Sequence, residues 1–166
     1  MKQIFVSATR QNDGKTMVSM GLFKAFQKRF GDVAYMKPVG QQYKLIDGQK
    51  IDKDAVLFHK VYDLSDPLIH MSPIAVPSGF TENYIANPHR DTLVQSISHA
   101  YKELTKDKKF LLVEGTGHAG VGSVFDMSNG DVAKLIGSKV VLVSLGGIGR
   151  SIDEIMLNKA CFDKAG

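Results

Sequence analysis

The triplet Gly-Lys-Thr at residues 14–16 constrains this chain most, because of what flanks it. Residues 3–7 are a short apolar run that predicts a buried strand. After the triplet, apolar residues recur at helical spacing, and Gly31 supplies a helix stop. A strand, a loop and a helix in this order aim backbone N–H groups and a lysine at one point, where phosphate binds. The sequence therefore predicts a phosphate site.

Within the triplet, each side chain has a distinct task. In the P-loop pattern the lysine serves the β- and γ-phosphates and the hydroxyl ligates magnesium, tasks that would fall to Lys15 and Thr16. The full pattern has a glycine where Thr9 stands. The competing interpretation is an ordinary helix N-terminus with a surface lysine, and the position after the first strand favours the phosphate site.

The rest of the chain alternates strands and helices. Further strands are predicted at 33–36, 110–113 and 140–143, and helices at 53–63, 89–106 and 152–164. Ser151 and Glu154 form a capping-box pattern at the last helix. The last two strands are continuously apolar, as strands buried on both faces of a parallel sheet are. Residues 65–88 hold four of the five prolines and are predicted to be irregular. This alternation predicts a three-layer α/β fold with a mostly parallel sheet flanked by helices.

Composition narrows the partners. A length of 166 residues fits one domain, 1–166, and no apolar run is long enough to span a membrane. The single cysteine, Cys161, cannot form an internal disulfide, which fits a reducing cytoplasm, and it is expected to pack on its helix. Residues 1–60 carry 11 Lys/Arg against 5 Asp/Glu, so an anionic partner is expected there. The basic residues are not interleaved with aromatics, which favours a small phosphate ligand over nucleic acid.

Carboxylates that could complete a metal site follow two predicted elements. Glu114 ends the strand at 110–113, where P-loop enzymes offer a carboxylate to magnesium, although a solvated strand-end glutamate is the alternative. Its neighbours Gly115 and Gly117 let backbone approach a ligand. Asp52 and Asp54 flank a helix start, so one is expected to be the N-cap, and Asp54 is favoured to face the metal.

Two basic residues and a histidine are further candidates. Lys37 ends the second strand before Pro38, so its ammonium should project from the carboxyl edge of the sheet, where ligands bind. An exposed strand-end lysine is the alternative. Arg10 lies inside the phosphate loop. His118 lies in the glycine-rich loop after Glu114, where contact with a ligand and a structural role are equally open.

Four motifs together resemble the dethiobiotin synthetase family. Residues 8–16, ATRQNDGKT, resemble its G-T-D-T-x-x-G-K-T loop; residues 37–39 match its K-P-V; residues 54–55 match its aspartate-alanine step; and residues 113–117 resemble its V-E-G-A-G. They occur in the same order with near-identical spacing over nearly the whole chain. The wider group includes the synthetase domain of cobyrinic acid a,c-diamide synthase and the N-terminal domain of some phosphotransacetylases.

The resemblance implies ATP and Mg²⁺, and a P-loop NTPase fold. Lys15 and Lys37 would be catalytic, and the metal would lie among Thr16, Asp54 and Glu114. Residues around the nucleotide would be Thr9, Arg10, Gln11, Asn12, Asp13, Gly14, Lys15, Thr16, Gly115 and Gly117. The reaction would be phosphoryl transfer to a carboxylate or carbamate of a small anionic substrate, in a cyclo-ligase or an amide-forming ligase. A non-catalytic nucleotide-binding regulatory module is the alternative.

Departures from the family pattern fall on the substrate side of the loop. Arg10 replaces an aspartate and Gln41 replaces a serine, which bears on the acceptor rather than on ATP chemistry. Arg10 also occupies the position of the signature lysine of related ATPases, so either an acceptor contact or a contact across a homodimer is open. The last helix is expected to precede a missing strand, so the chain is expected to be an N-terminal fragment that leaves residues 140–144 at an open sheet edge.

Overall fold

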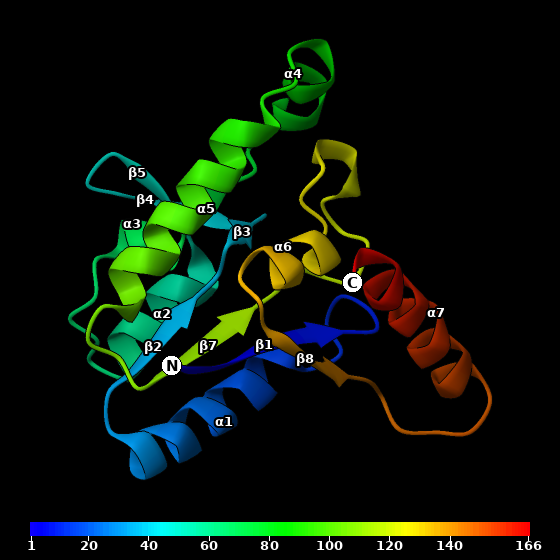
Figure 1. The fold of residues 1–166 in the computed structure, drawn as a ribbon, viewed down its shortest axis with the longest axis horizontal. Helices are drawn as coiled ribbons and strands as arrows, with labels where there is room; N and C mark the ends of the chain where they lie inside the picture. The colour runs from blue at the N-terminus through cyan, green and yellow to red at the C-terminus, as the bar shows by residue number, and fades with distance from the viewer.

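The computed structural model describes residues 1–166, and its centre is a parallel sheet in the order β2-β7-β1-β8. The strands are β1 (Lys2–Ala8), β2 (Val33–Met36), β7 (Phe110–Glu114) and β8 (Lys139–Val143). β1 pairs in parallel with β7 and β8, and β7 pairs in parallel with β2. All four carboxyl ends therefore meet at one edge of the sheet (Figure 1).

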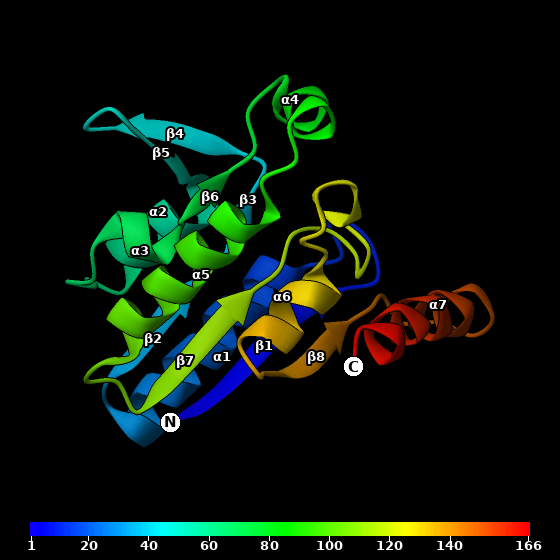
Figure 2. The same ribbon diagram turned by 45° about the horizontal axis from the view of Figure 1, so that its top comes forward.

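Helices cover both faces of this sheet, as Figure 2 shows. Helix α1 (Lys15–Phe30) lies on one face, and α5 (Arg90–Thr105) and α6 (Asn129–Leu135) lie on the other. Helix α2 (Lys53–Val61) packs beside α1 through Phe58 and Phe23, whose ring centroids are 5.5 Å apart. Helix α7 (Arg150–Ala165) lies beyond the β8 edge and contacts α6. The three-layer α/β fold is thereby confirmed.

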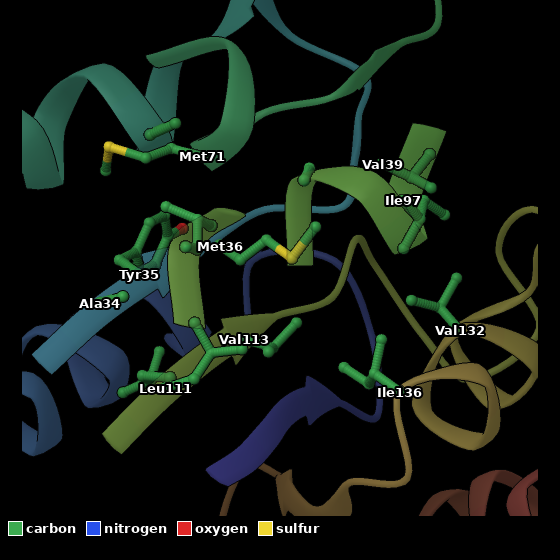
Figure 3. Close-up of a cluster of buried hydrophobic side chains, with 14 of the residues drawn as sticks. Ala34, Tyr35, Met36, Val39, Met71, Ile97, Leu111, Val113, Val132 and Ile136 are labelled. Atoms are coloured by element: carbon green, nitrogen blue, oxygen red, sulfur yellow. The ribbon is translucent and has the colours of Figure 1, made fainter. Parts of the chain in front are cut away.

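The core is apolar because the strands facing it carry almost no polar side chains. Every residue of β2 and β7 is buried, so the prediction of a strand buried on both faces holds for 110–113. Figure 3 shows side chains from these strands between residues of α3, α5 and α6, including Met71, Ile97 and Val132. Burial of such side chains stabilises each by about 1.5–3 kcal/mol relative to exposure.

The same prediction is wrong for residues 140–143. β8 pairs only with β1 and lies at the sheet edge, and none of its five residues is fully buried. Half-burial follows because no strand lies beyond it. Cys161 is exposed on α7 rather than packed, because α7 turns most of its surface to solvent.

Several short elements lie between β2 and α5. They are β3 (Val39–Gly40), β4 (Tyr43–Ile46), β5 (Gln49–Asp52), α3 (Leu68–Met71), β6 (Ile74–Ala75) and α4 (Phe80–Ala86). The prediction that 65–88 is irregular is therefore wrong in part. β4 and β5 form a separate antiparallel hairpin, whose turn residues Asp47 and Gly48 have φ of 49° and 77°.

Helix starts also differ from prediction in one place. Ser151 and Glu154 do not form a capping box, because α7 begins at Arg150, which places Ser151 inside the first turn. A capping box is present instead at α6, where Ser128 accepts from the backbone of Asp131. No helix is long and apolar enough to cross a membrane.

Candidate functional site

A cavity of about 260 Å³ opens at the carboxyl edge of the sheet, between the loop after β1 and the start of α2. The loop between β1 and α1 turns sharply, with φ of 70° at Asn12 and 86° at Gly14, the helix N-cap. The lining of the cavity is almost entirely polar. It consists of Gln11, Asn12, Gly14, Lys15, Thr16, Met17, Lys37, Gln41, Gln42, Asp52, Lys53, Asp54, Thr116 and Gly117. A helix N-terminus with lysines around it suits a phosphate.

Lys37 lies at the centre of an ion cluster. It follows β2 directly, is 3% exposed, and so is not the solvated strand-end lysine of the alternative interpretation. Its Nζ donates to Asp54 Oδ2 at 2.8 Å and to Glu114 Oε1 at 3.0 Å. The end of β2, the start of α2 and the end of β7 are thereby joined through one ammonium.

Glu114 ends β7 and is fully buried. Its Oε1 also accepts from Thr16 Oγ1 at 2.9 Å and lies 3.5 Å from Lys15 Nζ. Its Oε2 makes no hydrogen bond of good geometry within the protein, although the buried Tyr35 hydroxyl lies near this carboxylate, and burial together with that carboxylate raises the pKa of Tyr35. A buried carboxylate oxygen left without a donor is costly unless a ligand or an ion completes it.

The cluster shifts the pKa of both lysines, in opposite directions. Burial alone would lower the pKa of Lys37, but the carboxylates of Glu114, Asp54 and Asp52 outweigh it and raise that pKa above its usual value. Burial and the nearby Lys37 lower the pKa of Lys15, which Glu114 only partly offsets. Lys37 is therefore firmly charged at neutral pH, whereas Lys15 gains most from an added anion.

Asp52 and Asp54 have different roles at the start of α2. Asp52 Oδ1 accepts from the backbone N–H of Asp54 at 2.9 Å, so Asp52 is the N-cap of α2. Gly40 lies against it, since a Cβ at Gly40 would be 2.5 Å from Asp52 Oδ2. Burial raises the pKa of Asp52. Asp54 is the one that reaches Lys37.

Four of the ten residues expected around the nucleotide, Thr9, Arg10, Asp13 and Gly115, do not line the cavity, and neither does Glu114. Thr9 donates to Asp13 at 2.6 Å, which keeps both inside the loop. Arg10 turns away and pairs with Glu154 of α7, with Nε 3.0 Å from Oε2. Gly115 packs inward, because a Cβ there would lie 2.6 Å from Asn129 Oδ1.

His118 is exposed and is not among the cavity residues. Sequence reasoning missed Thr116, Gln42 and Lys53 as cavity residues. Thr116 occupies the middle of the Gly-x-Gly step, and its hydroxyl donates to the Val39 carbonyl. The position between two glycines beside Glu114 was the available signal for Thr116. Gln42 and Lys53 lie at the two ends of the hairpin, where no local pattern marked them.

A parallel α/β sheet, a phosphate loop between β1 and α1, and a strand-end glutamate bonded to the loop threonine define a P-loop NTPase domain. A family model described as an AAA domain (AAA_26) matches residues 2–166, and the chain belongs to this dethiobiotin synthetase-like family. The four sequence motifs predict the same family, which is thereby confirmed.

Curated relatives carry two kinds of name. The ATP-dependent dethiobiotin synthetase of Nitrosopumilus maritimus is 30% identical over 97% of this chain and 71% of the relative. The same enzyme of Methanocaldococcus jannaschii is 28% identical over 88% of this chain and 67% of the relative. The phosphate acetyltransferase of Nitratidesulfovibrio vulgaris is 26% identical over 86% of this chain, which spans only 20% of that relative.

Solved structures agree on the fold. The chimerical protein CapA2B2 aligns with a TM-score of 0.58 at 12% identity, over 99% of this chain and 71% of its own. The kinase domain of the Escherichia coli tyrosine kinase ETK aligns with a TM-score of 0.51 at 15% identity, over 99% of this chain and 63% of its own. At these identities the likeness concerns the fold alone.

Proposed function

We propose that the chain binds ATP with Mg²⁺ and transfers a phosphoryl group to a carboxylate or carbamate of a small anionic substrate. The observation that carries the proposal is the cluster in which Lys37 joins Glu114 to Asp54 while Thr16 and Lys15 approach the same glutamate. Phosphoryl transfer asks a protein mainly for positioning and charge neutralisation, and this cluster offers both.

The residues present fit a magnesium ion. Thr16, Asp54 and the unpartnered oxygen of Glu114 are hard oxygen donors, which Mg²⁺ prefers. The structure has no group of three or more His, Cys, Asp or Glu side chains suited to a metal. An ion held by few protein ligands together with substrate phosphates is the usual Mg²⁺ arrangement. When bound, the ion would neutralise charge between the β- and γ-phosphates.

The charge balance of the cavity also favours a bound divalent cation. Its lining holds three lysines, Lys15, Lys37 and Lys53, against Asp52 and Asp54, and Glu114 lies directly beneath. The lysines are therefore already neutralised, and a triphosphate would bring several uncompensated negative charges. A divalent cation supplies the missing positive charge.

In this proposal each residue has a task set by its position. The backbone of the loop ending at Gly14 and the Lys15 ammonium hold the phosphates at the α1 N-terminus. The charged Lys37 Nζ, fixed by two carboxylates, faces the cavity and stabilises negative charge on the transferred group or the acceptor. Gln41 and Gln42 also line the cavity, and their amides would be available to hydrogen-bond an acceptor.

A second candidate function is nucleotide binding without turnover. The match to one fifth of a phosphate acetyltransferase favours it, because there a domain of this kind is one part of a larger protein. The departure from the family pattern at Gln41 points the same way, since it alters the cavity lining while Gly14, Lys15 and Thr16 are kept.

Two measurements test the proposal. Calorimetry with a non-hydrolysable ATP analogue and Mg²⁺ should give 1:1 binding that weakens about tenfold to a hundredfold in Lys15→Ala, as expected for a lost charge-assisted contact. Glu114→Gln should lose most of the magnesium-dependent rise in thermal midpoint. Absence of binding by the parent, or parent-like affinity in Lys15→Ala, would refute nucleotide binding.

Turnover separates the two candidate functions. ADP release is measured with ATP, Mg²⁺, bicarbonate and the diamino acid precursor of dethiobiotin, and separately with simple dicarboxylates plus glutamine or ammonia. Stimulation by one acceptor set supports a ligase and identifies its type. Tight binding with no stimulated release by any acceptor supports the regulatory module.

A further inference from the structure

Helix α7 is attached to the rest of the molecule in an unusual way. Among its 16 residues only Asn158 is buried, at 8% exposure. Its large apolar side chains point outward, with Ile152 53% and Leu157 69% exposed. A surface helix normally docks through an apolar stripe, so the burial of a polar residue in its place calls for an explanation.

The Asn158 side chain joins two loops of the nucleotide site. Its Nδ2 donates to the Thr9 carbonyl at 3.1 Å, where the phosphate loop begins. Its Oδ1 accepts from the Ala119 N–H at 2.8 Å, in the loop after β7 that lines the cavity through Thr116 and Gly117. An amide side chain can make both hydrogen bonds at once, because its NH₂ group donates and its carbonyl oxygen accepts.

A second contact lies one helical turn away. Glu154 Oε2 is 3.0 Å from Arg10 Nε, and Glu154 Oε1 accepts from Arg150 Nε at 2.7 Å. The Glu154 carbonyl also accepts from Asn158 Nδ2 at 2.9 Å, which orients the amide. Helix α7 therefore contacts two successive residues of the phosphate loop, Thr9 and Arg10, without entering the cavity.

The loop after β7 is held from the other side by a second buried amide. Asn129 of α6 accepts from the Thr116 N–H at 3.1 Å and donates to the His118 carbonyl at 2.7 Å. Asn129 contacts only this loop, whereas Asn158 ties the loop to the phosphate loop. Asn158 therefore adds a direct hydrogen-bonded link between the two loops to the pairing of β1 with β7.

We propose that Asn158 is a positioning residue, which couples docking of α7 to the geometry of the phosphate site. The inference rests on the proposed nucleotide binding. Bound phosphates order the loop whose first carbonyl Asn158 holds, so nucleotide binding and α7 docking favour each other. Such coupling is reciprocal, so it can be measured from either end.

The test compares Asn158→Leu with Leu157→Ala in the 166-residue chain. Leucine is close in size but leaves the Thr9 carbonyl and the Ala119 N–H unpaired. Its Kd for the magnesium complex of a non-hydrolysable ATP analogue should rise at least tenfold, whereas the exposed control should stay within twofold. A lower ligand-free thermal midpoint with a parent-like Kd would show a purely structural role and overturn the proposal.

A second measurement needs no variant, so it holds if Asn158→Leu does not fold. In the parent chain, the bound analogue should slow hydrogen exchange at the Ala119 amide and along α7. If the parent binds the analogue and exchange there is unchanged, this inference fails and the proposed function stands. If the parent binds no nucleotide, both fail.

Discussion

Replacing Lys37 by methionine would leave Asp54 without its cation and Glu114 with only the more distant Lys15, whose Nζ lies 3.5 Å from Oε1. Glu114 is fully buried and Asp54 has a side chain only 15% exposed, so neither is well solvated. Breaking a buried pair by removing one partner typically costs about 3–5 kcal/mol. That is a large share of the roughly 5–15 kcal/mol that holds a domain folded. We therefore expect Lys37→Met to lower the unfolding free energy at pH 7 by about 3–5 kcal/mol.

Urea denaturation of the parent and the variant measures this difference directly. In the parent, Lys37 stays protonated at neutral and acidic pH. Its raised pKa contributes stability that is fully present below pH 10.5 and is lost as the pH rises through the pKa of the folded state, so the difference between parent and variant should narrow only at that alkaline pH.

Two further variants make the result decisive. The double variant Lys37→Met/Glu114→Gln should recover at least half of the loss, because the buried charge is gone. Lys106→Met removes a lysine whose partner, Glu103, lies on the surface, and it should leave the unfolding free energy nearly unchanged. A loss of unfolding free energy below about 1 kcal/mol in Lys37→Met would refute the argument that the ion pairs of Lys37 stabilise the fold strongly.

Three other predictions follow from the site. Gly115→Ala should lower the unfolding free energy by about 1–3 kcal/mol, because its Cβ would overlap Asn129 and Phe5. Gly21→Ala, in open space on α1, should raise the unfolding free energy by about 0.5–1 kcal/mol. Equal unfolding free energies of the two variants in urea titrations would contradict this. The affinity for ATP should fall as the pH rises through the lowered pKa of Lys15, which lies below 10.5. The affinity of the Lys15→Arg variant should not change over the same range, and binding titrations from pH 7 to 10 test both expectations. ATP and GTP should bind within about tenfold of each other, because the contacts expected in this cavity are to phosphates; side-by-side titration showing a preference above a hundredfold would reveal a base pocket.

Much of the fold was predictable because its long elements carry strong local patterns. The run Phe110–Val113 is continuously apolar, and the helix of 89–106 appears in the structure within one residue. The hairpin of β4 and β5 was missed although Asp47-Gly48 is a strong turn signal, because each strand has only four residues and shows no clear alternation of apolar and polar side chains. Helix α6 was missed because seven residues give too short a period to detect.

For the site, sequence order placed each strand end at the correct edge, but it did not show the pairings. The capping role of Asp52 follows from local geometry and was one of two open alternatives. Lys37 makes one of its two hydrogen bonds to Glu114, which is 77 positions away in the sequence. Asn158 makes one of its hydrogen bonds to Thr9, which is 149 positions away. Contacts across such separations leave no mark in local spacing, so they became visible only in the folded chain.

The ion pair between Lys37 and Asp54 closes a segment of the chain, since these residues are 17 positions apart. Inside that closure lies the hairpin, a sheet of its own that shares no strand with the central one. Residues 41–50 of this segment are almost all exposed, whereas Ile51 and Asp52 are buried. Changes confined to the tip of the hairpin should therefore leave the core and the phosphate loop in place.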